Sequence, residues 1–256
     1  MDIQKLFSLQ GRTALITGGS RGIGRMIAEG FVSAGARVYI SARKAQACDE
    51  TARELSAQGH CVSLPADVST VEGAKALAAA YAQHEKTLDI LVNNAGAAWG
   101  APYEEFPESG WDKVVDLNMK APFFLTQTLT PMLRAAATDH LAKVINIASI
   151  DGVSVNPLET YSYAASKAGL IHLTRRMALR LARERIVVSA IAPGAFPSSM
   201  NKDARDHADR TKERIPAGRI GEPEDMAAAA IYLASRAGDY VMGSTLIVDG
   251  GVAYAR

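Results

Sequence analysis

A tyrosine and a lysine in the second half of the chain have the spacing of a proton-handling pair. Tyr163 and Lys167 are four residues apart in the run YSYAASKAG. In a helix this spacing places both side chains on one face, so that the ammonium can lie beneath the phenol. A free phenol titrates near pH 10 and can donate a proton, as acid catalysis requires. The spacing is common in proteins, so it does not specify an activity by itself.

A glycine-rich turn near the N-terminus predicts a nucleotide site. The run TGGSRGIG, residues 17–24, follows a predicted strand and opens a predicted helix. Glycines allow a sharp turn and close approach to a pyrophosphate, whose charge is favoured by the free N–H groups at a helix N-terminus. The alternative is a tight turn without a ligand, and the strand-turn-helix placement favours the nucleotide. The expected contacts come from Gly18, Ser20, Arg21, Gly22, Ile23 and Gly24.

The end of the second predicted strand indicates which dinucleotide binds. Dinucleotide folds usually place an acidic residue there to bind the adenosine ribose, but Ser41 is followed by Ala42 and Arg43. Arg21 approaches the same place from the glycine turn, and two guanidinium groups suit a phosphate dianion. We therefore expect NADP rather than NAD. The alternative is that both arginines are solvated surface charges.

Three more polar motifs end predicted strands at one edge of the predicted sheet. They are Asp67 with Val68, the run Asn93-Asn94-Ala95-Gly96, and Ser149. Ligands of open α/β sheets bind at the carboxyl ends of the strands. These motifs are thus expected to lie beside the glycine turn.

In combination and in this order, the motifs resemble those of the classical short-chain dehydrogenase/reductase family. The resemblance runs from about Leu9 to Gly251. It rests on TGGSRGIG, Asp67-Val68, NNAG, Asn118, Ser149, Tyr163 with Lys167, Pro193-Gly194 and the final VDGG at 248–251. It implies a Rossmann-type, doubly wound parallel sheet of seven strands in the order 3-2-1-4-5-6-7, with helices on both faces. It also implies a homotetramer.

The resemblance implies a role for each of four residues in reducing a carbonyl by hydride from NADPH. Tyr163 would protonate the alkoxide, with its pKa lowered by roughly 2–3 units by Lys167 and the oxidised nicotinamide. Lys167 would also bind the nicotinamide ribose. Ser149 would bind the substrate oxygen, and Asn118 would hold a water chain that reprotonates the lysine. The presence of all four argues against a non-catalytic protein that only senses NADP(H).

The segment after the sixth predicted strand completes the expected site. The resemblance implies that Pro193, Gly194, Phe196 and Ser198 contact the cofactor, with Ser198 where many relatives have threonine. We expect Ser149, Trp99, Phe196 and Met200 to bind the substrate. Trp99 has plain packing as an alternative. The charged stretch at 196–218 breaks the strand-helix rhythm and is expected to act as a substrate lid.

The substrate is the least specified feature. The run IPAGRIGEP at 215–223 resembles the 3-oxoacyl reductases, and AWGAPYEEFPESGW at 98–111 resembles the ketoreductase branch that includes the rhamnolipid-pathway enzyme. We therefore expect an NADPH-dependent ketoreductase acting on a 3-oxoacyl thioester or a related ketone. A polyol, sugar-acid or steroid dehydrogenase is the alternative. A carrier protein would need a basic surface, for which residues 175–185 supply five arginines, although a solvated helix face explains them as well.

These residues are placed by alternating short apolar runs and longer segments of helical period, which predict a parallel sheet covered by helices. The predicted strands are at 13–17, 37–41, 61–66, 90–93, 143–148, 187–192 and 245–248. The predicted helices are at 22–34, 45–57, 71–84, 110–135, 162–183 and 223–233.

Composition sets the remaining limits. The 256 residues carry 28 basic and 27 acidic side chains, so no basic surface for nucleic acid is expected. A chain of this length is expected to form one domain over residues 1–256. Cys48, Cys61 and five histidines lack metal-ligand spacing, so no metal is expected. No apolar run approaches the roughly 18 residues of a membrane span, and no secretory signal begins the chain, so we expect no membrane partner and a cytoplasmic protein.

Overall fold

Seven strands form one parallel sheet in the computed structural model, which describes residues 1–198 and 206–255. The strands are β1 (Thr13–Thr17), β2 (Arg37–Ser41), β3 (Cys61–Ser63), β4 (Ile90–Asn93), β5 (Ala142–Ile147), β6 (Ile186–Pro193) and β7 (Thr245–Val248). Their order is β3-β2-β1-β4-β5-β6-β7, and every neighbouring pair is parallel. The predicted fold class and strand order are confirmed.

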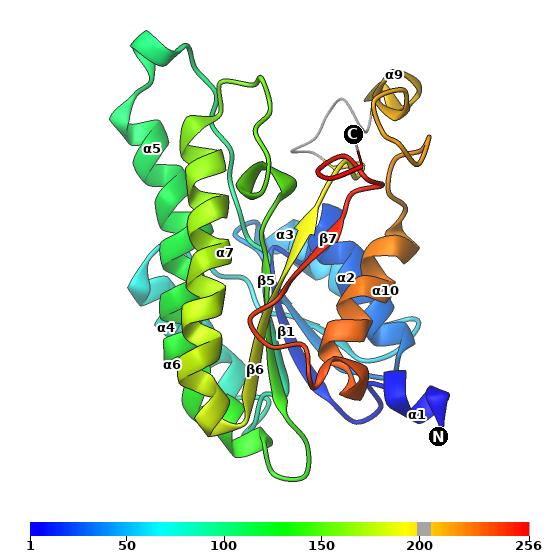
Figure 1. Ribbon diagram of the computed structural model, residues 1–256. Helices are drawn as coiled ribbons and strands as arrows, with labels where there is room; N and C mark the ends of the chain where they lie inside the picture. Colours follow the sequence, from blue (N-terminus) through cyan, green and yellow to red (C-terminus); the bar gives the residue numbers. More distant parts are fainter. Residues whose placement is uncertain (199–205, 256) are drawn as a thin grey trace.

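Helices cover both faces of this sheet (Figure 1). One face carries α2 (Gly22–Ser33), α3 (Ala45–Leu55) and α10 (Pro223–Ala234). The other carries α4 (Val71–Ala82), α6 (Ala121–Ala136) and α7 (Tyr161–Leu181), with α5 (Glu108–Val115) beside α7. Shorter helices are α1 (Ile3–Phe7), α9 (Ala208–Lys212), η1 (Tyr103–Glu105), η3 (Ile150–Gly152), η4 (Ala182–Glu184) and η5 (Arg236–Gly238).

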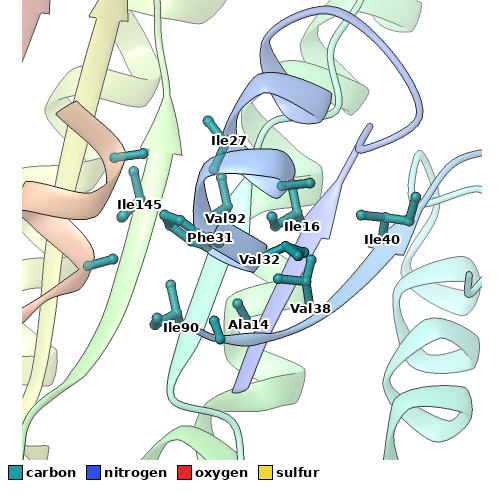
Figure 2. Packing of buried hydrophobic residues seen from close by; sticks show 14 of the residues in the cluster. Ala14, Ile16, Ile27, Phe31, Val32, Val38, Ile40, Ile90, Val92 and Ile145 are labelled. Atoms are coloured by element: carbon teal, nitrogen blue, oxygen red, sulfur yellow. The ribbon is translucent and has the colours of Figure 1, made fainter. Parts of the chain in front are cut away.

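The alternation of side chains along each central strand produces two hydrophobic layers. Ile16 of β1 and Val38 of β2 face α2, where Val32 lies beside them and Phe31 lies toward Val92 of β4 (Figure 2). Leu15 and Tyr39, the neighbours of these residues in sequence, face α4 and α6. Because both faces are covered, the central strands are apolar throughout rather than alternating apolar and polar residues.

The prediction of one continuous helix at 110–135 was only partly right. It is built from α5, a π-helix η2 (Asp116–Lys120) and α6. A single turn of π-helix leaves the spacing of apolar residues almost unchanged, so periodicity does not reveal it, although such turns are frequent at functional sites. The predicted strands at 13–17, 37–41, 90–93 and 245–248 have the predicted bounds, and the ends of the other predicted helices and strands differ by at most three residues. In contrast, α1 and α9 are too short to have a detectable period.

The described residues contain no cluster of three or more His, Cys, Asp or Glu side chains able to hold a metal ion. Within the same residues, no helix has both the length and the apolar character needed to cross a bilayer.

Candidate active site

Tyr163 and Lys167 lie on one face of the first turns of α7, as their spacing predicts. The Lys167 Nζ is 5.6 Å from the centre of the Tyr163 ring. Ser149 follows β5 and faces the same phenol, to which its hydroxyl is hydrogen-bonded. Ser149 and Lys167 are buried, and Tyr163 is partly buried.

Lys167 is held in place by the protein backbone. Its Nζ donates to the Ile147 carbonyl oxygen at the end of β5, at 2.7 Å. Gly96, at the end of the NNAG motif, lies over it: a Cβ there would be 3.7 Å from Nζ and 3.2 Å from the Asn118 Oδ1. A larger residue at 96 would crowd both side chains, which gives a steric reason for the glycine.

Asn118 lies in the π-helix η2, and its side-chain amide is fully engaged. The Oδ1 accepts from the Ala97 N–H at 2.8 Å, and Nδ2 donates to the Ala97 carbonyl at 2.9 Å and to the Ser166 Oγ at 3.0 Å. Ser166 in turn donates to the main-chain carbonyl of Tyr163 at 2.8 Å. The amide thus joins the loop after β4 to α7, so a water chain at Asn118 would have to start from its main chain.

Burial controls the charge state of the pair. Desolvation raises the pKa of Tyr163 to about 12, opposed by the hydrogen bond from Ser149 and reinforced by the charge of Asp151. Desolvation also lowers the pKa of Lys167 to about 8, with Asp151 acting in the opposite direction. The expected lowering of the Tyr163 pKa is therefore not produced by the side chains of the chain itself, because burial outweighs them.

The glycine turn and the NNAG motif are tied together at the adjacent strand ends. Gly18 has a left-handed φ of 66°, and a Cβ on Gly24 would overlap the Gly18 carbonyl oxygen. The Asn94 Nδ2 donates to the carbonyls of Thr17 at 2.9 Å and Gly18 at 3.2 Å. The Thr17 hydroxyl accepts from the Asn94 and Ala95 N–H groups, both at 3.0 Å. This turn is narrow and fixed, as a phosphate cradle requires.

The surroundings of this turn fit a phosphorylated dinucleotide. The N-cap residue of α2, Arg21, makes no side-chain capping hydrogen bond, so it leaves the first N–H groups of the helix to an anion. Arg21 and Arg43 are both exposed, and neither guanidinium group forms an ion pair or hydrogen bond with another described residue. The Ser41 Oγ at the end of β2 is buried without a partner. Asp67 is exposed at the end of the β3 segment, and Val68 beside it is buried.

The segment after β6 comes back to the glycine turn. A Cβ on Gly194 would lie 2.7 Å from the Asp249 Cβ, and one on Gly22 would lie 3.2 Å from the Ser198 Cβ. Phe196 is 3% exposed and packs in the core on the α2 side, with its ring against Gly221. Its side chain therefore contributes to the core, and substrate contact remains a prediction for it. Met200 lies outside the described residues.

Trp99 follows the NNAG motif and packs on α5. A Cβ on Gly110 would lie 2.7 Å from its ring, and the Lys113 Nζ is 5.1 Å from the ring centre. The packing alternative thus accounts for at least one face of the indole. An open cavity of about 490 Å³ is lined by Gly100, Ala101, Pro102, Pro157, Leu158, Glu159 and Thr160; Ser149, Tyr163 and Lys167 are not among these described lining residues.

Three features of the site were missed from the sequence. Ser166 lies inside the Tyr-Lys motif but resembles any small helical residue. Asn146, the last but one residue of β5, accepts from the Asn93 Nδ2 at 2.8 Å and donates to the Thr174 hydroxyl at 2.9 Å, forming a buried polar layer beneath the site. Asp151 acts electrostatically on Tyr163 and Lys167. A polar residue inside an apolar strand was the available signal for Asn146.

Comparison with known proteins agrees with this geometry. Residues 18–253 match the family model described as enoyl-(acyl carrier protein) reductase. The chain is 50% identical over 249 residues to the rhamnolipids biosynthesis 3-oxoacyl-[acyl-carrier-protein] reductase of Pseudomonas aeruginosa, covering 96% of this chain and 97% of that protein. It is 40% identical over 254 residues to 2-dehydro-3-deoxy-D-gluconate 5-dehydrogenase of Dickeya dadantii, covering 97% and 98%.

Among solved structures, the Pseudomonas aeruginosa RhlG/NADP active-site complex superimposes with a TM-score of 0.94 at 50% identity. The match covers 97% of this chain and 99% of that one.

Proposed function

Because the chain belongs to the short-chain dehydrogenase/reductase family, among its 3-oxoacyl reductase-like members, we propose that it reduces a ketone to a secondary alcohol with NADPH. The observation that carries this proposal is the grouping of Ser149, Tyr163 and Lys167 at one sheet edge beside the glycine turn. Binding alone would need no phenol held against a serine and a lysine.

The cofactor would be held by the residues around the glycine turn and the strand ends. These are Gly18, Ser20, Arg21, Gly22, Ile23, Gly24, Arg43, Asp67, Val68, Asn94, Ala95, Gly96, Tyr163, Lys167, Pro193, Gly194, Phe196 and Ser198. The unpartnered Arg21 and Arg43 support NADP(H), since two guanidinium groups stabilise a dianion. When bound, the nicotinamide supplies the hydride.

The chain's own residues handle the oxygen and the proton. Ser149 would donate a hydrogen bond to the substrate oxygen, and Tyr163 would transfer its phenolic proton to that oxygen as negative charge develops. Lys167, fixed by the Ile147 carbonyl, would stabilise the phenolate left behind. Asn118 holds the loop after β4 against α7 and so keeps the pair in place.

We propose a 3-oxoacyl thioester or a related ketone as substrate. The described residues that line the cavity of about 490 Å³ are mainly apolar and include no lysine or arginine. Their one carboxylate, Glu159, accepts from the Tyr103 N–H at 3.3 Å and the Tyr161 hydroxyl at 3.2 Å. This wall suits an acyl chain better than an anionic sugar acid. The sugar-acid alternative is supported by the Dickeya dadantii relative.

The test is a spectrophotometric screen of NADPH oxidation with 3-oxoacyl thioesters, diketones, keto sugar acids and ketosteroids. We expect the thioesters to give the highest kcat/KM, and Tyr163→Phe serves as the inactive control. Turnover confined to the sugar acids would favour the alternative. Measured NADPH binding without turnover on any ketone would favour an NADP(H)-sensing protein.

Four further assignments belong to this proposal. We propose that the protein acts as a homotetramer. We also propose that it lies in the cytoplasm, where thiols stay reduced, as the two free, buried cysteines at 48 and 61 would require. An acyl carrier protein would present the thioester. The five arginines at 175–185 would form the surface for it, but Arg180 pairs with Glu184 and Arg185 donates to the Ala137 carbonyl, so a solvated helix face stays the alternative. The segment at 196–218 would close over the bound substrate.

A further inference from the structure

Glu159 joins two segments that are far apart in the sequence. Its main-chain carbonyl oxygen accepts from the Ala101 N–H at 3.3 Å, and its side-chain Oε1 accepts from the Tyr103 N–H at 3.3 Å. The Tyr161 hydroxyl donates to the same Oε1 at 3.2 Å. One residue in the connection between β5 and α7 thus receives three hydrogen bonds, two of which come from the segment between β4 and α5.

Aromatic rings close the same junction. The Tyr103 and Tyr161 rings meet edge to face with their centres 5.5 Å apart, and the Phe106 ring meets that of Tyr161 at 5.7 Å. Gly100 lies close as well, since a Cβ there would be 3.6 Å from the Glu159 carbonyl oxygen. Because edge-to-face aromatic pairs stabilise beyond the area they bury, the two segments are held together by side chains as well as by hydrogen bonds.

Both segments continue directly from the catalytic motifs. Gly100 is four residues after Gly96, where a Cβ would lie 3.7 Å from the Lys167 Nζ, and Thr160 is three residues before Tyr163. An extended chain spans at most about 3.6 Å per residue, so Gly100 lies within about 14 Å of Gly96. The described residues that line the cavity of about 490 Å³ all belong to these two segments. The junction at Glu159 is therefore part of the wall of this cavity.

We propose that Glu159 is a positioning residue that fixes the wall along which the acyl chain of the substrate binds, and so gives the enzyme a preference for long acyl chains. This inference rests on the proposed function. Leu158, which also lines the cavity, is 68% exposed and would bury apolar area against an acyl chain. Binding costs less when the receiving segments are already ordered, and an acyl chain too short to reach the wall gains nothing from that order.

The test compares two thioesters with the full-length protein and NADPH. In Glu159→Ala the Tyr103 N–H and the Tyr161 hydroxyl lose their acceptor. The KM for 3-oxooctanoyl coenzyme A should rise about three- to tenfold, the cost of ordering about one side chain on binding, while kcat stays within about twofold. Both constants for acetoacetyl coenzyme A should stay within about twofold of the wild type. Hydrogen exchange over residues 99–105 should be faster in this variant, with or without substrate.

Two variants control this result. Glu159→Gln keeps the accepting Oε1 and should restore the wild-type KM and exchange. Glu104→Ala removes an exposed carboxylate of η1 that accepts no hydrogen bond and forms no ion pair with another described residue, so it should change neither quantity.

An unchanged KM for the long thioester in Glu159→Ala, or an equal rise for both thioesters, would overturn the proposal. So would the same rise in Glu104→Ala, since it would make the loss of a nearby carboxylate the cause. A wild-type protein that reduces neither thioester would overturn the proposed function instead, and faster exchange in Glu159→Ala but not in Glu159→Gln would still support the junction that Glu159 makes.

Discussion

Asn118 and Ser166 are joined by a buried hydrogen bond between two helices, from Nδ2 to Oγ at 3.0 Å. Because the Ser166 hydroxyl donates a hydrogen bond to the Tyr163 carbonyl, the π-helix after α5 is linked to the turn of α7 that carries the phenol. The same amide binds Ala97 on both its N–H and its carbonyl. The hydrogen-bonded link from these two segments to α7 thus runs through the Ser166 hydroxyl.

Ser166→Ala should lower the free energy of unfolding by about 1–3 kcal/mol, because it leaves the Asn118 amide donor without its buried acceptor. Ser162→Ala is the matched control: Ser162 is equally buried on α7, but its Oγ has no partner. That variant should change stability by less than about 0.5 kcal/mol. Urea denaturation of both variants measures the difference, and equal losses would show that the hydrogen bond to Asn118 contributes nothing.

Lys167 should make stability rise with pH. Its pKa falls from 10.5 in the unfolded chain to about 8 in the folded one, so between these values the unfolded chain binds more protons. This pH-dependent gain in the free energy of unfolding is fully present above pH 10.5 and is lost as the pH falls through about 8. When the pH is lowered from 10 to 7, the free energy of unfolding of Lys167→Met should therefore increase by about 2 to 3 kcal/mol relative to that of the wild type.

Urea titrations of the wild type and Lys167→Met at these two pH values give the comparison, with Lys75→Met, which removes an exposed lysine of α4, as the control. A stability difference between wild type and Lys167→Met that does not depend on pH would contradict the lowered pKa of the buried amine.

The fold was predictable because local and global signals agree along most of the chain. The apolar runs at β1, β2, β4, β5 and β6 are buried on both faces, and a run of that kind predicts a central parallel strand. The glycine turn and the strand-end motifs then follow from topology, since all carboxyl ends of a parallel sheet share one edge. For this reason Tyr163, Lys167, Ser149 and Asn118 were found as one group from spacing and resemblance.

The features that were missed depend on contacts between distant segments. Nothing in the order of residues shows that Ser166 bonds Asn118, because the two are 48 residues apart. The electrostatic role of Asp151 and the raised pKa of Tyr163 come from burial, which is a property of the packed structure. Trp99 and Phe196 are large apolar residues near the site, and whether such a residue packs or binds is decided by its neighbours in space.

Tyr163→Phe should lower kcat for ketone reduction by at least about a hundredfold, the contribution of a positioned general acid. The ring and its place over Lys167 are retained, so the Kd for NADPH should change less than about threefold. Stopped-flow reduction and fluorescence titration measure the two quantities. Activity near the wild-type level would remove Tyr163 from the proton transfer.

The charged segment around α9 should be protected when ligands bind. α9 has five residues and an exposed Lys212–Asp209 pair at 2.6 Å, whereas Ile215 just after it is buried against Gly250. Segments with few buried contacts open at low cost. Hydrogen exchange over 206–214, with and without NADPH and a ketone inhibitor, should slow on binding, while α10 stays unchanged. Exchange that is slow from the start would identify the segment as scaffold.

Exchanging the residues that follow β2 should reverse the cofactor preference. Ala42→Asp with Arg43→Ala removes one guanidinium from the expected phosphate site and adds a carboxylate that would repel the phosphate and bind ribose hydroxyls. Because each charge-assisted contact contributes about 1.5–3 kcal/mol, the Kd for NADPH should rise at least about tenfold. The ratio of kcat/KM for NADH to that for NADPH should rise with it.

Arg53→Ala, which removes a cation from the far end of α3, is the control and should leave both values near those of the wild type. A wild-type protein that uses NADH as well as or better than NADPH would contradict the assignment of Arg21 and Arg43 to the phosphate.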